Sequence, residues 1–134
     1  MKKQNPLRNQ EGFTLVEIIA VLIILGILAA VAVPRYIDLE SSAKTRAIDA
    51  AVAELNGRES LVWADVKIST TNGWVSDATI WGYPQYSIDL GADYPWDTAP
   101  TSATNTGILT FKGVNFNLSR TVSTNTKPAV WVRK

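Results

Sequence analysis

The most regular feature of the chain is an apolar run that extends from Phe13 to Val33. From Ile18 onward the run holds only aliphatic side chains, alanine and one glycine, and its charged residue is Glu17. As a helix rising about 1.5 Å per residue, the run is long enough to cross the roughly 30 Å hydrocarbon core of a bilayer. A carboxylate at that depth costs at least about 2.5 kcal/mol. Glu17 therefore needs a partner, and the run itself supplies no cation.

The pattern after Pro34 is amphipathic but still helical. An apolar stripe at helical spacing runs to Val66, with Glu59 interrupting it, and alanines and charged residues occupy the other faces. The members of the stripe are Ile48, Val52, Leu55, Val62 and Val66. Pro34 would kink or end a helix, but because the pattern continues, we expect one helix from about Phe13 to Val66. Its amphipathic half, residues 35–66, needs a surface to pack on.

Residues 67–106 lose this periodicity and are rich in glycine, proline, tryptophan and tyrosine. They predict a long loop with short elements near Ala78–Trp81 and Tyr86–Leu90. We expect the aromatic side chains to hold this loop against the domain. A functional loop is the less favoured alternative, since long loops in compact domains are often functional.

The last part of the chain alternates apolar and polar residues, as strands with one buried face do. Ile108–Lys112 and Val114–Leu118 flank Gly113 and predict a tight hairpin, and Ala129–Arg133 predicts a third strand. Three or four antiparallel strands in residues 107–134 would give the amphipathic half-helix its packing surface. The predicted fold class is α+β, with a long N-terminal helix packed on a small C-terminal antiparallel sheet.

Composition narrows the chemistry that the chain can perform. Its formal net charge of +1 indicates no basic surface for nucleic acid, and it contains no cysteine and no histidine. These absences exclude disulfides, thiolate zinc sites and the usual nucleophilic triads, so no enzyme class is indicated. Asp89, Asp93 and Asp97 are spaced four apart and could bind calcium, but the spacing is not that of an EF-hand. We expect solvated carboxylates there, and no other cofactor.

The first 12 residues form a short polar leader that ends at Gly12. Its basic residues are Lys2, Lys3 and Arg8, against Glu11. By the positive-inside rule this end stays in the cytoplasm, and the chain after Pro34 is exported. Ala30-Val31-Ala32 would serve as an ordinary signal cleavage site that releases a protein beginning at Val33. Against that interpretation, the apolar run is longer than the apolar region of a secretory signal peptide, which usually has about 7–15 residues. The helical pattern also continues through the cleavage site.

The segment Gly12-Phe13-Thr14-Leu15-Val16-Glu17, followed by an unbroken apolar helix with Gly26 and Pro34, resembles the type IV pilins and type II secretion pseudopilins. The resemblance covers Gly12 to about Leu39 and does not extend to the C-terminal half. It implies that a prepilin peptidase cuts between Gly12 and Phe13 and methylates the new N-terminus. Glu11 departs from the family pattern, in which a basic residue is common there.

The resemblance also implies an organisation and an assembly mode. Residues 1–12 would be a cleaved leader, residues 13–34 a transmembrane or filament-core half-helix, and residues 35–134 a periplasmic or extracellular domain. Glu17 would pair with the Phe13 amine of a neighbouring subunit, which supplies the missing cation. Gly26 would be either a helix packing site or a point where the helix unwinds.

The expected partners are therefore membrane lipid before assembly, the prepilin peptidase, the inner-membrane assembly machinery, and further copies of the chain in an extracellular helical filament. Pro34-Arg35-Tyr36-Ile37-Asp38-Leu39 is more similar to pilins of the mannose-sensitive haemagglutinin type than to the major secretion pseudopilin. A secretion pseudopilin, a minor or tip pilin, and a secreted or anchored binding module remain as alternatives.

Overall fold

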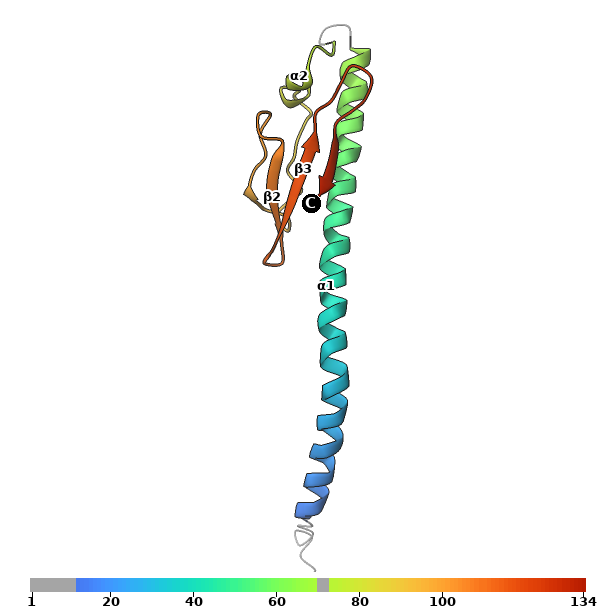
Figure 1. The fold of residues 1–134 in the computed structure, drawn as a ribbon, viewed down its shortest axis with the longest axis vertical. Helices are drawn as coiled ribbons and strands as arrows, with labels where there is room; N and C mark the ends of the chain where they lie inside the picture. Colours follow the sequence, from blue (N-terminus) through green and yellow to red (C-terminus); the bar gives the residue numbers. More distant parts are fainter. Residues whose placement is uncertain (1–11, 70–72) are drawn as a thin grey trace, which may run out of the picture. The chain divides into compact units, whose positions relative to one another are not determined.

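The computed structural model describes residues 12–69 and 73–134. Within these ranges the chain forms two helices and four strands. They are α1 (Leu15–Ile68), α2 (Asp77–Trp81), β1 (Trp96–Thr98), β2 (Thr106–Phe111), β3 (Val114–Thr121) and β4 (Val130–Arg133) (Figure 1). The chain divides into two units, Met1–Glu40 and Ser41–Lys134, and α1 begins in the first and ends in the second.

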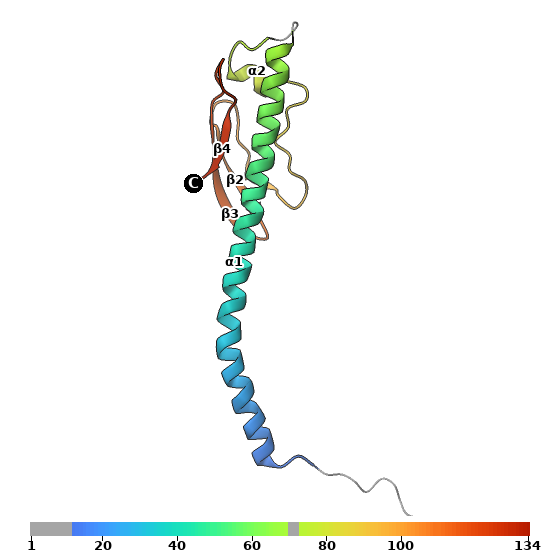
Figure 2. The same cartoon turned by 90° about the vertical axis from the view of Figure 1, so that its right-hand side faces the viewer.

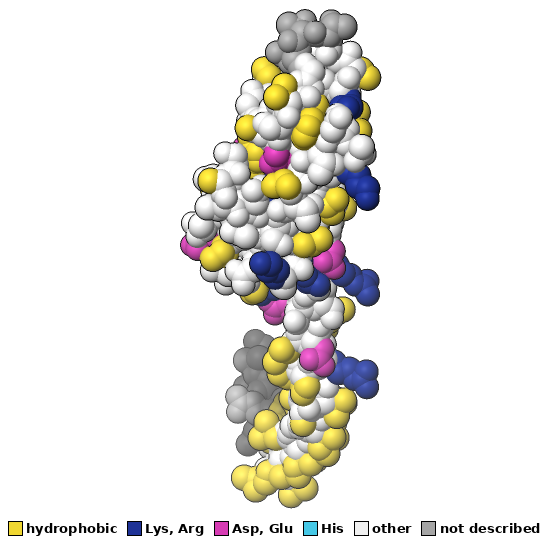
Figure 3. Space-filling view, turned by 45° about the horizontal axis from the view of Figure 1, so that its top comes forward, with side chains coloured by type: hydrophobic (Ala, Val, Ile, Leu, Met, Phe, Trp, Pro, Cys, Tyr) yellow, Lys and Arg dark blue, Asp and Glu magenta, His cyan; other side chains and the backbone are white. Residues whose placement is uncertain are grey.

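In the first unit, α1 carries apolar side chains on all its faces, and the described side chains there are exposed. The helix continues through Pro34, as the sequence predicts, although proline cannot donate the backbone hydrogen bond to the preceding turn. Figure 3 shows hydrophobic side chains spread over the visible face of this part of the chain. A helix that is apolar all round requires lipid or other helices around it.

In the second unit, α1 buries one stripe of side chains. Its buried residues are Ile48, Ala51, Leu55, Glu59, Val62 and Val66. The predicted stripe is thus confirmed, with Val52 half-buried beside it and Ala51 fully included. Figures 1 and 2 both show the strands lying along this part of α1. The sheet is the surface that the amphipathic half-helix requires.

The sheet is antiparallel with the strand order β1-β2-β3-β4. The predicted hairpin is confirmed as β2 and β3, in which Phe111 pairs with Val114 and Leu109 with Phe116. Lys112 and Gly113 form its two-residue turn, and both have positive φ, 46° and 75°. That combination defines a type I′ turn, whose twist matches the twist of the flanking strands.

Two details differ from the sequence prediction. Tyr86–Leu90 forms no helix or strand, and Trp96–Thr98 forms a strand, β1, that the prediction lacks. β1 is three residues long, lies close to two prolines and pairs irregularly with β2, so it has no readable alternation. The predicted element at Ala78–Trp81 is confirmed as α2, and the third predicted strand as β4.

The core of the second unit joins α1 to the sheet. One cluster of buried residues contains Ile48, Ala51, Leu55, Leu109, Leu118 and Trp131. A second cluster contains Val62, Val66 and Ile80, and it packs α2 against the C-terminal part of α1. Gly107 lies where β2 meets β1, and a Cβ atom there would come within 2.8 Å of Pro100 and Trp96. The close approach of these strands therefore requires glycine.

Candidate functional site

The predicted cleavage point lies just outside the first helix. Gly12 and Phe13 have no regular secondary structure, and Phe13 is 83% exposed. A Cβ built on Gly12 would meet no atom within 4 Å, and the backbone of Gly12 is not in the left-handed region. The fold of the described residues therefore does not require glycine at position 12, and any such requirement comes from another molecule.

Thr14 and Glu17 together cap the start of α1, with Thr14 directly before the helix and Glu17 in its first turn. The Glu17 Oε2 accepts hydrogen bonds from the Thr14 backbone N–H at 2.8 Å and from the Thr14 hydroxyl at 2.9 Å. The Glu17 N–H donates to the Thr14 Oγ1 at 3.2 Å, and the N–H of Ile18 donates to the Thr14 carbonyl. This arrangement is a capping box, in which the N-cap and N3 residues satisfy each other's free backbone donors.

The sequence prediction located Glu17 but missed Thr14 as its partner. The signal was present, because Thr14-Leu15-Val16-Glu17 has the capping-box spacing directly before the apolar run. Phe13 lies next to this pair in sequence. The three predicted residues Gly12, Phe13 and Glu17 thus occupy one short segment at the start of α1, where no described cation reaches Glu17.

Gly26 and Pro34 both lie inside α1. A Cβ on Gly26 would meet no atom within 4 Å, so the described structure offers no internal reason for a residue that costs about 1 kcal/mol relative to alanine in a helix. A close helix neighbour or a need to unwind would each explain it, and both stay predictions.

The apolar surface around these residues is continuous. Among the described residues, α1 is the helix long and apolar enough to cross a membrane, although a signal sequence would pass the same test. The exposed large apolar residues of the first unit are Phe13, Leu15, Val16, Ile18, Ile19, Val21, Leu22, Ile23, Ile24, Leu25, Ile27, Leu28, Val31, Val33, Tyr36, Ile37 and Leu39. Such a surface is far larger than the apolar patches that soluble monomers tolerate.

The three aspartates of the calcium prediction are not gathered. Among the residues that the structure describes, no group of three acidic side chains is placed to hold a metal ion. The Asp89 carboxylate instead accepts the N–H of Gly91 at 2.8 Å, and the Asp89 carbonyl accepts a hydrogen bond from Arg58 at 2.6 Å. Calcium binding by Asp89, Asp93 and Asp97 has no support from this geometry.

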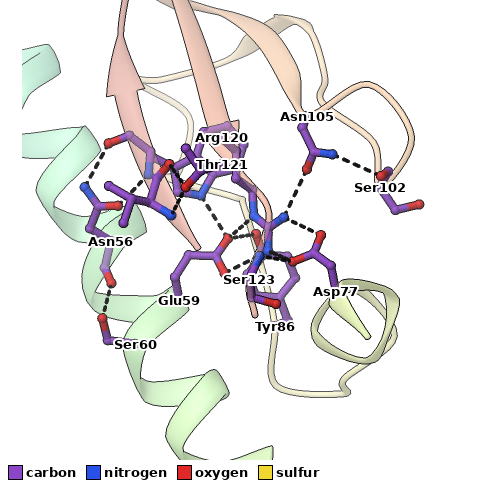
Figure 4. A network of polar contacts seen from close by, with 12 residues as sticks. Asn56, Glu59, Ser60, Asp77, Tyr86, Ser102, Asn105, Arg120, Thr121 and Ser123 are labelled. Carbon is purple, nitrogen blue, oxygen red and sulfur yellow. Dashed lines mark hydrogen bonds and ion pairs between the residues drawn. The ribbon is translucent and has the colours of Figure 1, made fainter. Parts of the chain in front are cut away.

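A buried ion cluster that the sequence prediction missed joins α1, α2 and β3 (Figure 4). Arg120 on β3 donates to both oxygens of Glu59 at 2.5 and 3.0 Å, and to both oxygens of Asp77 at 2.6 and 3.0 Å. A further bond of 3.0 Å reaches the Asn105 side-chain oxygen. The arrangement uses the full donor capacity of a guanidinium group. Glu59 is fully buried, so the interruption of the apolar stripe was the signal for this cluster.

The surroundings of the cluster shift the pKa values of its members. Burial alone would raise the pKa of the Asp77 carboxyl, but hydrogen bonds from Arg120 and Ser123 outweigh burial and lower it. Burial and a hydrogen bond to Glu59 at 2.5 Å raise the pKa of the Tyr86 phenol. The Trp131 indole also donates to Glu59, at 3.0 Å. These groups hold the loop and the sheet to α1.

The aromatic residues of the loop point to partners within the domain. Trp74 donates to Ser123 at 3.2 Å and Trp96 to the Ile88 carbonyl at 3.0 Å, while Tyr83 donates to Asp65. Aromatic rings also pair, as Tyr94 stacks on Phe111 and Trp81 meets Tyr86 edge-on. The prediction that the aromatic side chains hold the loop against the domain is confirmed.

Comparison with known proteins connects these features to a family. The family model described as "Prokaryotic N-terminal methylation motif" matches residues 7–33. The chain is 31% identical over 115 residues to "Type II secretion system core protein G" of Pseudomonas aeruginosa, covering 67% of this chain and 81% of that protein. It is 29% identical over 126 residues to "Type IV major pilin protein PilE1" of Neisseria gonorrhoeae, covering 93% of this chain and 70% of that protein.

A third relative matches over a shorter stretch. The chain is 39% identical over 57 residues to "Type IV narrow pilus major component PilA5" of Thermus thermophilus, and the match spans 42% of this chain and about half, 49%, of that protein. No solved structure matches the chain significantly.

Proposed function

The chain belongs to the family of type IV pilins and type II secretion pseudopilins, and we propose that it is a structural subunit of a pilus-like filament. One observation carries the proposal. A helical segment that is apolar on all faces and exposed begins at a capping box whose N3 residue is a carboxylate. Burial of this segment among copies of itself would supply assembly free energy at about 25 cal/mol per Å² of apolar surface.

The subunit begins as a membrane protein in this proposal. The segment 13–34 anchors it in the inner membrane, the basic leader stays in the cytoplasm, and residues 35–134 lie outside. A prepilin peptidase removes residues 1–12 and methylates Phe13. In support, Gly12 is a glycine that the chain's own fold does not require, next to an exposed residue outside the helix.

Cleavage then creates the cation that Glu17 lacks. The new Phe13 amine of one subunit pairs with the Glu17 carboxylate of a neighbour, and the pair fixes the register between the two helices. In an apolar surrounding, the attraction within an ion pair offsets the desolvation cost of the two charges only when their remaining hydrogen-bonding positions are also satisfied. The partner machinery and the peptidase are inferred from family membership, and the role is structural and not enzymatic.

The mass and N-terminal sequence of the protein from its native host test the processing step. We expect a chain that starts at Phe13 with one added methyl group. A chain that starts at Val33 would show ordinary secretion, remove Glu17 from the mature protein, and end this proposal in favour of a secreted binding module.

A secretion pseudopilin is the second candidate, and the match across 81% of a secretion core protein favours it. The two candidates differ in where filaments form. A pilus subunit is recovered as fibres sheared from cells, whereas a pseudopilin supports protein secretion and remains in the cell envelope. A minor or tip pilin would be present in fibres at a small fraction of the major subunit.

A further inference from the structure

The two carboxylate oxygens of Glu17 have different surroundings. Both hydrogen bonds from Thr14 end on Oε2. Within the described residues, no group donates a hydrogen bond to Oε1. A carboxylate offers about four lone-pair positions, so Oε1 can accept a further donor while the capping box stays intact.

We propose that Thr14 is a positioning residue, which holds Oε2 of Glu17 so that Oε1 is presented to the incoming amine of a neighbouring subunit. This inference rests on the proposed function, since it concerns the same pairing of Glu17 with a Phe13 amine. Its new element is that assembly adds a charged partner to a carboxylate that its own chain already orients. The Thr14 hydroxyl thereby contributes to assembly and to the register of the filament.

The positioning follows from side-chain freedom and from charge. A glutamate side chain has three rotatable bonds, and a charge-assisted hydrogen bond requires its oxygen within a narrow range of distance and angle. Two donors on one oxygen remove most of that freedom before the amine arrives. The same donors, together with the positive end of the helix dipole, compensate for part of the desolvation of the carboxylate while the subunit is still in lipid.

A role limited to starting the helix makes a different prediction. Glutamine serves at N3 of a capping box as well as glutamate does, but it carries no charge for an amine to pair with. Loss of the Thr14 hydroxyl would then impair assembly equally in the wild-type chain and in a Glu17→Gln background. Positioning of the carboxylate predicts that the two substitutions are not additive.

The test measures filament yield in Thr14→Val, Thr14→Ser and Glu17→Gln, and in the double variant Thr14→Val/Glu17→Gln. Thr45→Val is the matched control, because it makes the same change in the same helix at a residue without a side-chain hydrogen bond among those described. Leader removal and membrane retention are measured for each variant. We expect about a fivefold loss for Thr14→Val, the scale of losing one capping interaction, and near wild-type yield for Thr14→Ser and Thr45→Val.

A second readout does not depend on yield. In assembled filaments, a carbodiimide joins the Glu17 carboxylate to the neighbour's N-terminal amine with loss of water, and mass spectrometry counts the joined peptide per subunit. We expect less of it in Thr14→Val filaments than in Thr45→Val filaments. Equal cross-linking, wild-type yield for Thr14→Val, or additive losses in the double variant would each overturn the inference. If the wild-type chain forms no filaments, the proposed function fails instead.

Discussion

Glu17 and Glu59 both interrupt an apolar pattern on α1, and the structure resolves them in different ways. Glu59 is fully buried and binds Arg120 of the same chain, so its charge is neutralised within the folded domain. Glu17 is exposed and has only Thr14, a neutral partner, among the described residues. A carboxylate on an apolar face thus indicates a partner in both cases, and for Glu17 we propose that the charged partner comes from another chain.

Replacing Glu17 by valine tests that requirement. We expect Glu17→Val to lose its leader normally and to stay in the membrane, because the apolar segment becomes more apolar. Filament yield should fall strongly, since the neighbour's amine then has no carboxylate to pair with. Glu54→Gln, which removes an exposed carboxylate farther along α1, is the control and should assemble normally. Normal fibres at normal yield from Glu17→Val would show that the pairing role is wrong.

Gly12 is the second residue whose identity the fold leaves unexplained. Gly12→Leu adds a side chain into open space, so we expect no change in the stability of the domain. If a prepilin peptidase removes the leader as proposed, the peptidase and not the subunit requires glycine, so we expect the leader to remain attached. The mass of the membrane-bound protein decides the matter, and a correctly trimmed product from Gly12→Leu would exclude the peptidase assignment.

Arg120 is the residue on which the buried cluster depends. Arg120→Met leaves two carboxylates, Glu59 and Asp77, without their cation, and removing one partner of a buried pair costs about 3–5 kcal/mol. We expect a loss of that size in the free energy of unfolding, measured by urea denaturation. Arg133→Met is the control, because its ion pair with Asp49 is largely solvent-exposed and worth less than about 1 kcal/mol. Equal losses in both variants would contradict the special role of the cluster.

At the scale of elements, the sequence predicts what local patterns encode. The helix through Pro34 follows from an apolar run joined to a helical stripe, and the hairpin follows from alternation around Gly113. β1 and the Arg120 cluster were not predictable in this way. β1 depends on its pairing with β2, and Arg120 meets Glu59 across 61 positions of the chain. Both arise from tertiary packing, which leaves little signal in local composition.

Glycines in two elements allow an element-scale prediction. Gly57→Ala lies in α1 with no atom near the added Cβ, so we expect it to stabilise the domain by about 1 kcal/mol through helix propensity. Gly107→Ala forces β2 away from Trp96 and Pro100, and we expect it to destabilise by about 1–3 kcal/mol. Thermal unfolding of the two variants should shift in opposite directions, and a stabilised Gly107→Ala would show that β1 yields easily.

The molecule as a whole combines two units with different requirements. The first unit exposes its apolar residues and reaches a stable environment only in lipid or among other helices. The second unit has its own core, a satisfied ion cluster and a loop held by aromatic contacts. Because its buried surface comes from its own residues, we expect the second unit to fold without assembly. Variants of the first unit should change assembly, and variants of the second should change stability.

The stability of the second unit should depend on pH at both extremes. The pKa of Asp77 is lowered in the folded protein, where hydrogen bonds from Arg120 and Ser123 outweigh burial. The unfolded chain therefore binds more protons in acid, and the free energy of unfolding should fall as the pH drops below about 4. The pKa of Tyr86 is raised by burial and by its bond to Glu59. The folded state then keeps a proton that the unfolded chain loses, so stability should also fall above about pH 10.

Urea unfolding followed by tryptophan fluorescence measures this profile in the full chain in detergent, because all five tryptophans lie in residues 41–134. We expect a nearly constant free energy of unfolding between the fall in acid (the acid limb) and the fall in alkali (the alkaline limb). Asp77→Asn should flatten the acid limb and Tyr86→Phe the alkaline limb, each through loss of its titrating group. Asp93→Asn, a change to an exposed residue outside the cluster, should leave both limbs in place. An acid limb of unchanged slope in Asp77→Asn would mean that other carboxylates carry the acid dependence and that the cluster does not couple folding to pH.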